Sequence, residues 1–128
     1  MELPDLRRQA MYLGRLRFLI GLSMLVMPAR SARIWSGPAG SDSNPWIRMT
    51  GLREVAIGAG TDIAAGERNG ASWLSIAALV DVGDGLLGVL GRGVPTRTRL
   101  FGLAVIGLGV AQLMLSRDLA AQERPGSA

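Results

Sequence analysis

The chain contains no cysteine and no histidine. The absence of cysteine excludes disulfides and thiol chemistry, and the absence of histidine excludes histidine-ligated haem and, with no thiolate available, the usual zinc sites. Acid-base chemistry would have to rest on aspartate, glutamate, arginine or the single tyrosine, Tyr12. The sequence therefore predicts no catalytic residue, no metal site and no cofactor.

Lysine is also absent, so all 14 basic residues are arginines, and with 10 acidic residues the formal net charge is +4. The arginines are spread along the chain instead of forming one basic stripe, which argues against nucleic-acid binding. Arginine without lysine, together with many alanines and glycines, is typical of a bacterial protein from a GC-rich genome.

The hydrophobic content is high for a chain this short. Its 128 residues leave room for a single domain, residues 1–128, and 48% of them are hydrophobic. Four apolar helices are expected, at about 6–28, 46–66, 71–91 and 99–116, followed by a polar tail at 117–128. Such a short chain cannot hide four helices that are apolar on nearly all sides from water. We therefore expect an all-α fold, an integral membrane four-helix bundle surrounded by the lipid bilayer.

The connections between these segments predict the topology. The segment 30–44 reads as a loop rich in serine, glycine and proline, and the later connections are short, so the helices should run up and down with both termini on the same side. Five arginines fall on each side of the expected membrane. Counting Arg15 and Arg17 with the amino terminus favours a multi-pass cell-membrane protein with cytoplasmic termini.

Charged residues within the apolar segments are the most informative feature. The second and third segments contain Arg48, Arg53, Glu54, Asp62, Asp81 and Asp84. Insertion scales assign roughly 2.5–3.5 kcal/mol to each unpaired charge at a helix centre, so these side chains should form a buried polar network. Arg53 is expected to face Asp81 or Asp84 across the hairpin. Glu54 is expected to face one of three arginines: Arg15, Arg17 or Arg48.

Small residues share the faces that carry these charges. Helical periodicity places Gly51 and Gly58 beside Glu54, and it places Gly85 and Gly88 beside the two aspartates. Small residues let membrane helices approach closely. We therefore expect the second and third helices to pack together as a close antiparallel hairpin. Gly102, Gly107 and Gly109, together with Ala111, predict a similar packing surface on the fourth helix.

The charged pattern resembles a known family. The stretch WIRMTGLREVAIG from Trp46, with the Asp84-Gly85 pair on the next helix, is similar to the membrane family catalogued as domain of unknown function 4267. The resemblance runs from Arg17 to about Ser116. It implies a four-helix membrane unit and the importance of Arg48, Arg53, Glu54 and Asp84, although the family commonly has aspartate where this chain has Glu54. It implies no reaction. A more distant likeness is to DoxX-like small membrane proteins.

Several functions fit this pattern. The leading interpretation is a non-enzymatic accessory or structural unit whose charged network fixes helix packing. The alternative is a small proton-coupled transporter, or a ligand-binding or lipid-binding membrane protein, that uses Asp81 and Asp84. Docking against a partner membrane protein or a second copy is a further possibility, and a membrane enzyme lacks a nucleophile. A cavity beside the two aspartates would favour the alternative, whereas saturated aspartates without a cavity would argue against transport.

Overall fold

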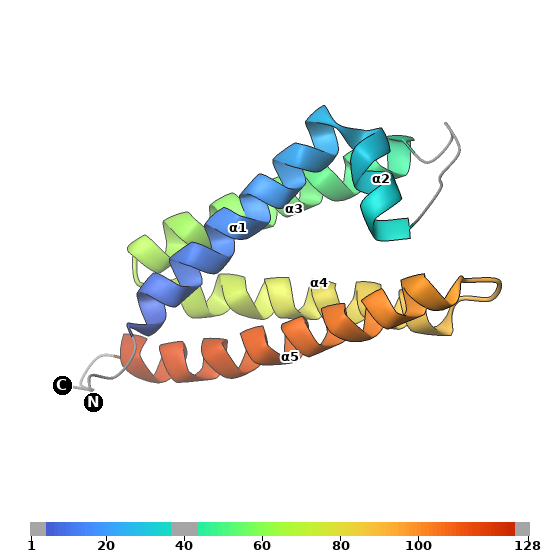
Figure 1. Ribbon diagram of the computed structural model, residues 1–128. Coiled ribbons are helices and arrows are strands. Elements are labelled where there is room, and N and C mark those ends of the chain that lie inside the picture. Colours follow the sequence, from blue (N-terminus) through green and yellow to red (C-terminus); the bar gives the residue numbers. More distant parts are fainter. Residues whose placement is uncertain (1–4, 37–43, 125–128) are drawn as a thin grey trace.

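The computed structural model describes residues 5–36 and 44–124. These residues are 90% helical and contain no strand, which confirms the all-α class. Five helices follow one another along the chain (Figure 1): α1 (Leu6–Val26), α2 (Pro28–Ser36), α3 (Asn44–Gly66), α4 (Gly70–Leu90) and α5 (Thr96–Glu123).

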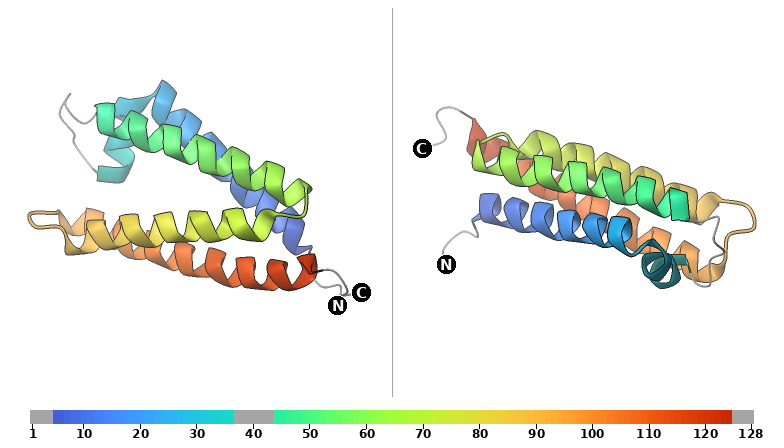
Figure 2. Two further views of the ribbon diagram at one scale, coloured as in Figure 1. Left: turned by 180° about the vertical axis from the view of Figure 1, so that it is seen from behind. Right: turned by 90° about the horizontal axis from the view of Figure 1, so that it is seen from above.

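The four long helices are arranged as two pairs. Helix α1 packs along α3, and α4 packs along α5, each pair being antiparallel (Figures 1 and 2). The pairs meet at the end where α3 turns into α4, and they diverge toward the other end. A buried core lies at the end where the pairs meet and draws on all four helices: Ala10, Ala65, Ala71, Leu74 and Leu119.

Glycines allow the close approach of α1 and α3. A Cβ added at Gly14 would lie 2.7 Å from the carbonyl oxygen of Gly58, and one added at Gly21 would lie 2.6 Å from that of Gly51. The two contacts repeat seven residues apart on each helix, as expected for one antiparallel interface. The backbones touch here, so a side chain at these positions would force the helices apart.

Glycines also allow the close approach of α4 and α5. A Cβ at Gly85 would lie 2.5 Å from the Gly102 carbonyl oxygen, and one at Gly109 would lie 2.9 Å from the Ala78 carbonyl oxygen. A Cβ added at Gly88 would lie 3.5 Å from the Gly102 Cα, and one added at Gly107 would have nothing within 4 Å, so the expectation that Gly107 belongs to this packing surface is wrong. The expectation of a close hairpin between the second and third long helices is therefore wrong. The glycine faces of α3 and α4 are occupied by α1 and α5, so α3 and α4 diverge beyond their shared turn.

Two segments expected to be irregular are helical. Helix α2 occupies residues 28–36, mostly within the loop expected at 30–44, and it bends by 118° from α1. The rest of that expected loop, residues 37–43, lies outside the described residues. Helix α5 continues to Glu123 instead of ending near 116, because Leu119 is buried in the core and the Glu123 carboxylate accepts a hydrogen bond from the Gly70 amide at 3.0 Å. That carboxylate satisfies a free amide at the start of α4.

The described helices include candidate membrane spans. Helices α4 and α5 are long and apolar enough to cross a bilayer, and the bent pair of α1 and α2 gives a third candidate if it counts as one broken span. Only 28% and 17% of the most apolar windows of α4 and α5 are buried within the protein. Much of their apolar surface therefore faces outward, as in a multi-pass membrane protein.

Candidate functional site

A buried arginine joins all four long helices. Arg17 of α1 donates from Nη1 to Asp81 Oδ2 of α4 at 2.8 Å and from Nη2 to Glu54 Oε1 of α3 at 3.1 Å. Its Nη2 also donates to Asp81 Oδ1, and Gln112 of α5 donates from Nε2 to Asp81 Oδ2. The three charged side chains are 7–12% exposed. We call Arg17, Glu54, Asp81 and Gln112 the central cluster.

The glycine faces place the central cluster between the helix pairs. Arg17 lies between Gly14 and Gly21 on one side of α1, and Glu54 lies between Gly51 and Gly58 on α3. Because the spacings are three and four residues, each charged side chain emerges beside the backbone contacts. Close packing of each pair thus directs its charged residue inward toward the other pair.

A second ion pair crosses from α3 to α4. Both Nη atoms of Arg53 donate to the carboxylate of Asp84, with 3.1 Å between Nη1 and Oδ1. This is one of the two partners expected for Arg53. The side chains are 39% and 37% exposed, and Arg53 Nε lies 3.8 Å from Glu54 Oε1. The ion pair is therefore a half-buried continuation of the central cluster.

Asp62 and Arg48 lie outside the central cluster. Asp62 pairs with Arg15 at 3.1 Å on the outer side of α1 and α3, where the Arg15 side chain is 56% exposed. Arg48 is exposed, and the expectation that it joins a buried network is wrong. Six residues of helix separate Arg48 from Glu54, which rotates the two side chains by about 120° from each other. Glu54 instead contacts Arg17, one of its three expected partners.

A cavity of about 340 Å³ lies beside the central cluster, between the two helix pairs. Arg17, Glu54 and Asp81 line its charged end. Further lining residues come from the halves of the helices that lie toward the diverging end: Ile20, Met24, Ile47, Thr50, Gly88, Phe101, Val105 and Leu108. Arg97 at the start of α5 donates to the Ile34 carbonyl of α2 at 3.1 Å, so α2 is tied across this end. The cavity therefore combines a buried charged end with mostly apolar walls.

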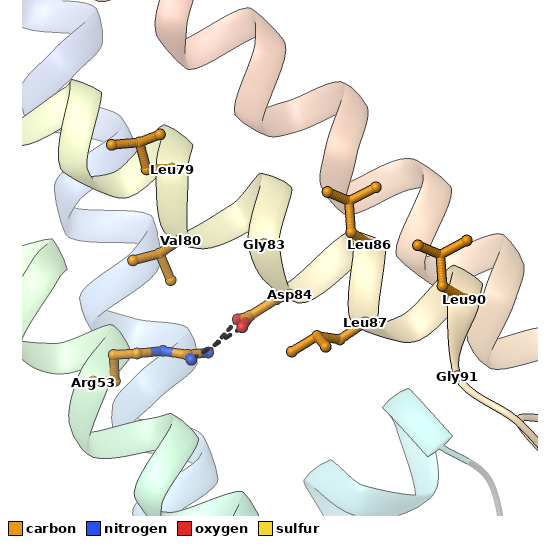
Figure 3. A pocket seen from close by; sticks show the side chains of 9 residues that line it. All are labelled: Arg53, Leu79, Val80, Gly83, Asp84, Leu86, Leu87, Leu90 and Gly91. Carbon is orange, nitrogen blue, oxygen red and sulfur yellow. Dashed lines mark hydrogen bonds and ion pairs between the residues drawn. The ribbon is translucent and has the colours of Figure 1, made fainter.

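A more open groove adjoins this cavity on the surface of α4. It has a volume of about 610 Å³ and is lined mainly by leucines, with Arg53 and Asp84 at its inner edge. Figure 3 shows these two side chains pointing toward each other, with Leu87 and Val80 beside them. Arg53 and Asp84 also line the cavity, so their ion pair forms a wall shared by the cavity and the groove.

No family model, curated protein or solved structure matches the chain. Among the described residues, no group of three or more aspartates and glutamates is arranged to hold a metal ion.

The sequence predicted only some of the residues of the candidate site. Arg17 was expected only as one possible partner of Glu54, and Gln112 was not anticipated. Both carry a signal in the sequence: Arg17 lies between two glycines seven residues apart, and Gln112 follows Gly109 by three residues. A polar residue on a glycine face of a membrane helix points at the neighbouring helix. That rule would have identified both side chains.

Proposed function

We propose that the chain is an integral membrane protein that binds a small amphiphilic ligand in the cavity between its helix pairs, without catalysing a reaction. The observation that carries this proposal is the cavity of about 340 Å³ with a charged end and apolar walls. Ligand sites are typically concave and largely apolar, with a few convergent polar groups. A network that served only to fix helix packing would need no such space.

The packing role proposed from the sequence is compatible with this function. Arg17 bonds carboxylates from both helix pairs, so it holds the cavity walls at a fixed separation. Proton transport by way of the two aspartates is less well supported, because Asp81 and Asp84 each accept hydrogen bonds from a guanidinium group. We therefore favour binding over transport.

We further propose that the four long helices form an up-down bundle in the cell membrane, with both chain ends in the cytoplasm. The exposed leucines of α4 and α5 would then meet lipid acyl chains. The same proposal would place α2, which presents Arg30 and Arg33 outward, at the headgroup region. This arrangement is the one expected for the family catalogued as domain of unknown function 4267, which the chain resembles. The resemblance implies no reaction.

Photolabelling in lipid nanodiscs tests the binding function. The probe is a short-chain alkyl alcohol with a photoreactive diazirine in the chain, alongside versions that carry a trimethylammonium or a sulfonate head. Labelling of cavity residues such as Thr50 and Val105 should saturate with at least one probe, whereas labelling of lipid-facing residues should rise linearly. Labelling that saturates shows that the probe binds at a limited number of sites.

Two substitutions on neighbouring residues of α3 provide the control. Thr50→Phe places a ring in the cavity and should abolish saturable labelling. Met49→Phe adds a ring of the same size at a position that is 62% exposed and does not line the cavity, so labelling should persist. If no probe labels the cavity residues saturably, the binding function is wrong.

A further inference from the structure

The charges around the cavity do not balance. Two guanidinium groups, on Arg17 and Arg53, face three carboxylates, on Glu54, Asp81 and Asp84, which leaves one excess negative charge. The fourth member of the central cluster, Gln112, is neutral. Resting on the proposed binding function, we propose that the ligand is an amphiphilic monocation, an alkylammonium or similar group whose positive head lies at Glu54.

Hydrogen bonding identifies Glu54 as the carboxylate that receives the head. Asp81 accepts hydrogen bonds from both Arg17 and Gln112, and Asp84 is bonded by both Nη atoms of Arg53. Arg17 contacts both oxygens of Glu54, with Nε 2.6 Å from Oε2 and Nη2 3.1 Å from Oε1, but Glu54 shares this guanidinium with Asp81, and the nearest atom of Arg53 is 3.8 Å away. Of the three carboxylates, Glu54 is therefore the one whose only hydrogen-bond donor among the described residues is shared with another carboxylate.

The surroundings of Glu54 favour a cation with an apolar body. Its side chain is 12% exposed and lines the cavity, so a charge there is poorly screened by water. Beyond it the cavity walls are apolar side chains such as Ile20, Val105 and Leu108. A positive head at Glu54 would bring the charges to balance, and an alkyl body would fill the remaining space. An anionic head would instead add to the excess negative charge.

The three photolabelling probes test this inference because they share one apolar body and differ only in the head. At pH 7 the trimethylammonium probe should half-saturate cavity labelling at a concentration at least about tenfold lower than the neutral alcohol does. The reason is that attraction between the positive head and one nearby carboxylate, at an effective dielectric constant near 20, is worth more than a tenfold gain in affinity. The sulfonate probe should label the cavity least.

Glu54→Gln removes the excess charge with little change in shape, and it should bring the cationic and neutral probes to within about twofold of each other. Asp62→Asn is the matched control, since Asp62 pairs with Arg15 outside the cavity and the cation preference should remain. If Glu54→Gln does not fold, the three-probe comparison on the unaltered protein decides alone.

Each result of that comparison has one meaning. Equal half-saturation by the cationic and neutral probes overturns the cation inference but leaves the binding function intact, and it indicates that a proton balances the charge. Preference for the sulfonate overturns the inference in favour of anion binding by the arginines. Absence of saturable labelling by all three probes overturns the binding function itself.

Discussion

Arg17 and Asp81 are 64 residues apart in the chain, yet two hydrogen bonds join them in the protein interior. The contact links α1 to α4, and so one helix pair to the other, at the level where the pairs begin to separate. Glu54 reaches the same guanidinium from α3. The most buried ion pairs between the helix pairs therefore converge on Arg17, and the half-buried pair of Arg53 with Asp84 forms a second link.

Replacing Arg17 with methionine should destabilise the protein by about 3–5 kcal/mol, because Glu54 and Asp81 would be left buried without their cation. The measurement is the thermal unfolding midpoint in detergent, together with the amount of protein that elutes as a single folded species. Arg15→Met is the control, two residues away, where the 56% exposed ion pair with Asp62 should contribute about 0–1 kcal/mol. Equal effects of the two substitutions would contradict a central role for Arg17.

Neutralising the whole cluster should rescue the methionine variant. In Arg17→Met combined with Glu54→Gln and Asp81→Asn, no charge is left unpaired in the central cluster, so much of the lost stability should return. The same unfolding measurement checks this outcome. A triple variant less stable than Arg17→Met alone would show that the carboxylates have partners beyond Arg17 that stabilise them as ions.

Gly109→Ala should destabilise α5 against α4 by about 1–3 kcal/mol, because the added Cβ would lie 2.9 Å from the Ala78 carbonyl oxygen. Gly107→Ala is the matched control on the same helix, where nothing lies within 4 Å of the added Cβ. The control should be neutral or more stable by up to about 1 kcal/mol, since alanine favours helix over glycine. Thermal unfolding of the two variants side by side decides whether the glycine contact sets the packing.

Arg53→Leu should lower membrane accumulation less than Arg17→Met does. Its partner Asp84 is 37% exposed and borders the open groove, so the unpaired carboxylate retains access to polar surroundings. The expected loss of stability is about 1–2 kcal/mol, between the values for exposed and buried pairs. Exchanging the two residues, as Arg53→Asp with Asp84→Arg, should recover part of it. No recovery in the exchanged variant would indicate that Arg53 acts mainly through Glu54.

Single cysteines can report the membrane arrangement without background, because the chain has none of its own. Arg68→Cys in the turn between α3 and α4 and Gly93→Cys in the turn between α4 and α5 should lie on opposite sides of the membrane. A membrane-impermeant maleimide applied to intact cells should label Gly93→Cys and spare Arg68→Cys if the termini are cytoplasmic. Labelling of both at equal rates would contradict a membrane-spanning α4.

The sequence predicted the helical class and a contact of Arg53 with either Asp81 or Asp84, of which the structure has Asp84, because hydropathy and helical periodicity are local properties. It did not predict which helices pair. Consecutive helices usually pack together, and that rule favours α3 against α4. Contact between α1 and α3 depends instead on the match of Gly14 and Gly21 with Gly58 and Gly51, which is a relation between distant segments.

The cavity was not predicted from the sequence either, because it depends on how the two helix pairs face each other. Where the pairs meet, the buried residues include Ala10, Ala65 and Ala71, which allow close approach. At mid-length the side chains of Arg17, Glu54 and Asp81 meet between the pairs, and the cavity lies beside them. Each residue is visible in the sequence, but the divergence appears only when the pairs face each other.

The distance along the chain between Arg17 and Asp81 also constrains the order of biosynthesis. At roughly 5–20 residues per second, a ribosome needs about 3–13 s to make the 64 residues that separate them. During that time Arg17 lacks this counterion, and of its two carboxylate partners Glu54 is made before Asp81. The central cluster can therefore form only after α4 and α5 have been translated, because Asp81 and Gln112 lie in the second half of the chain.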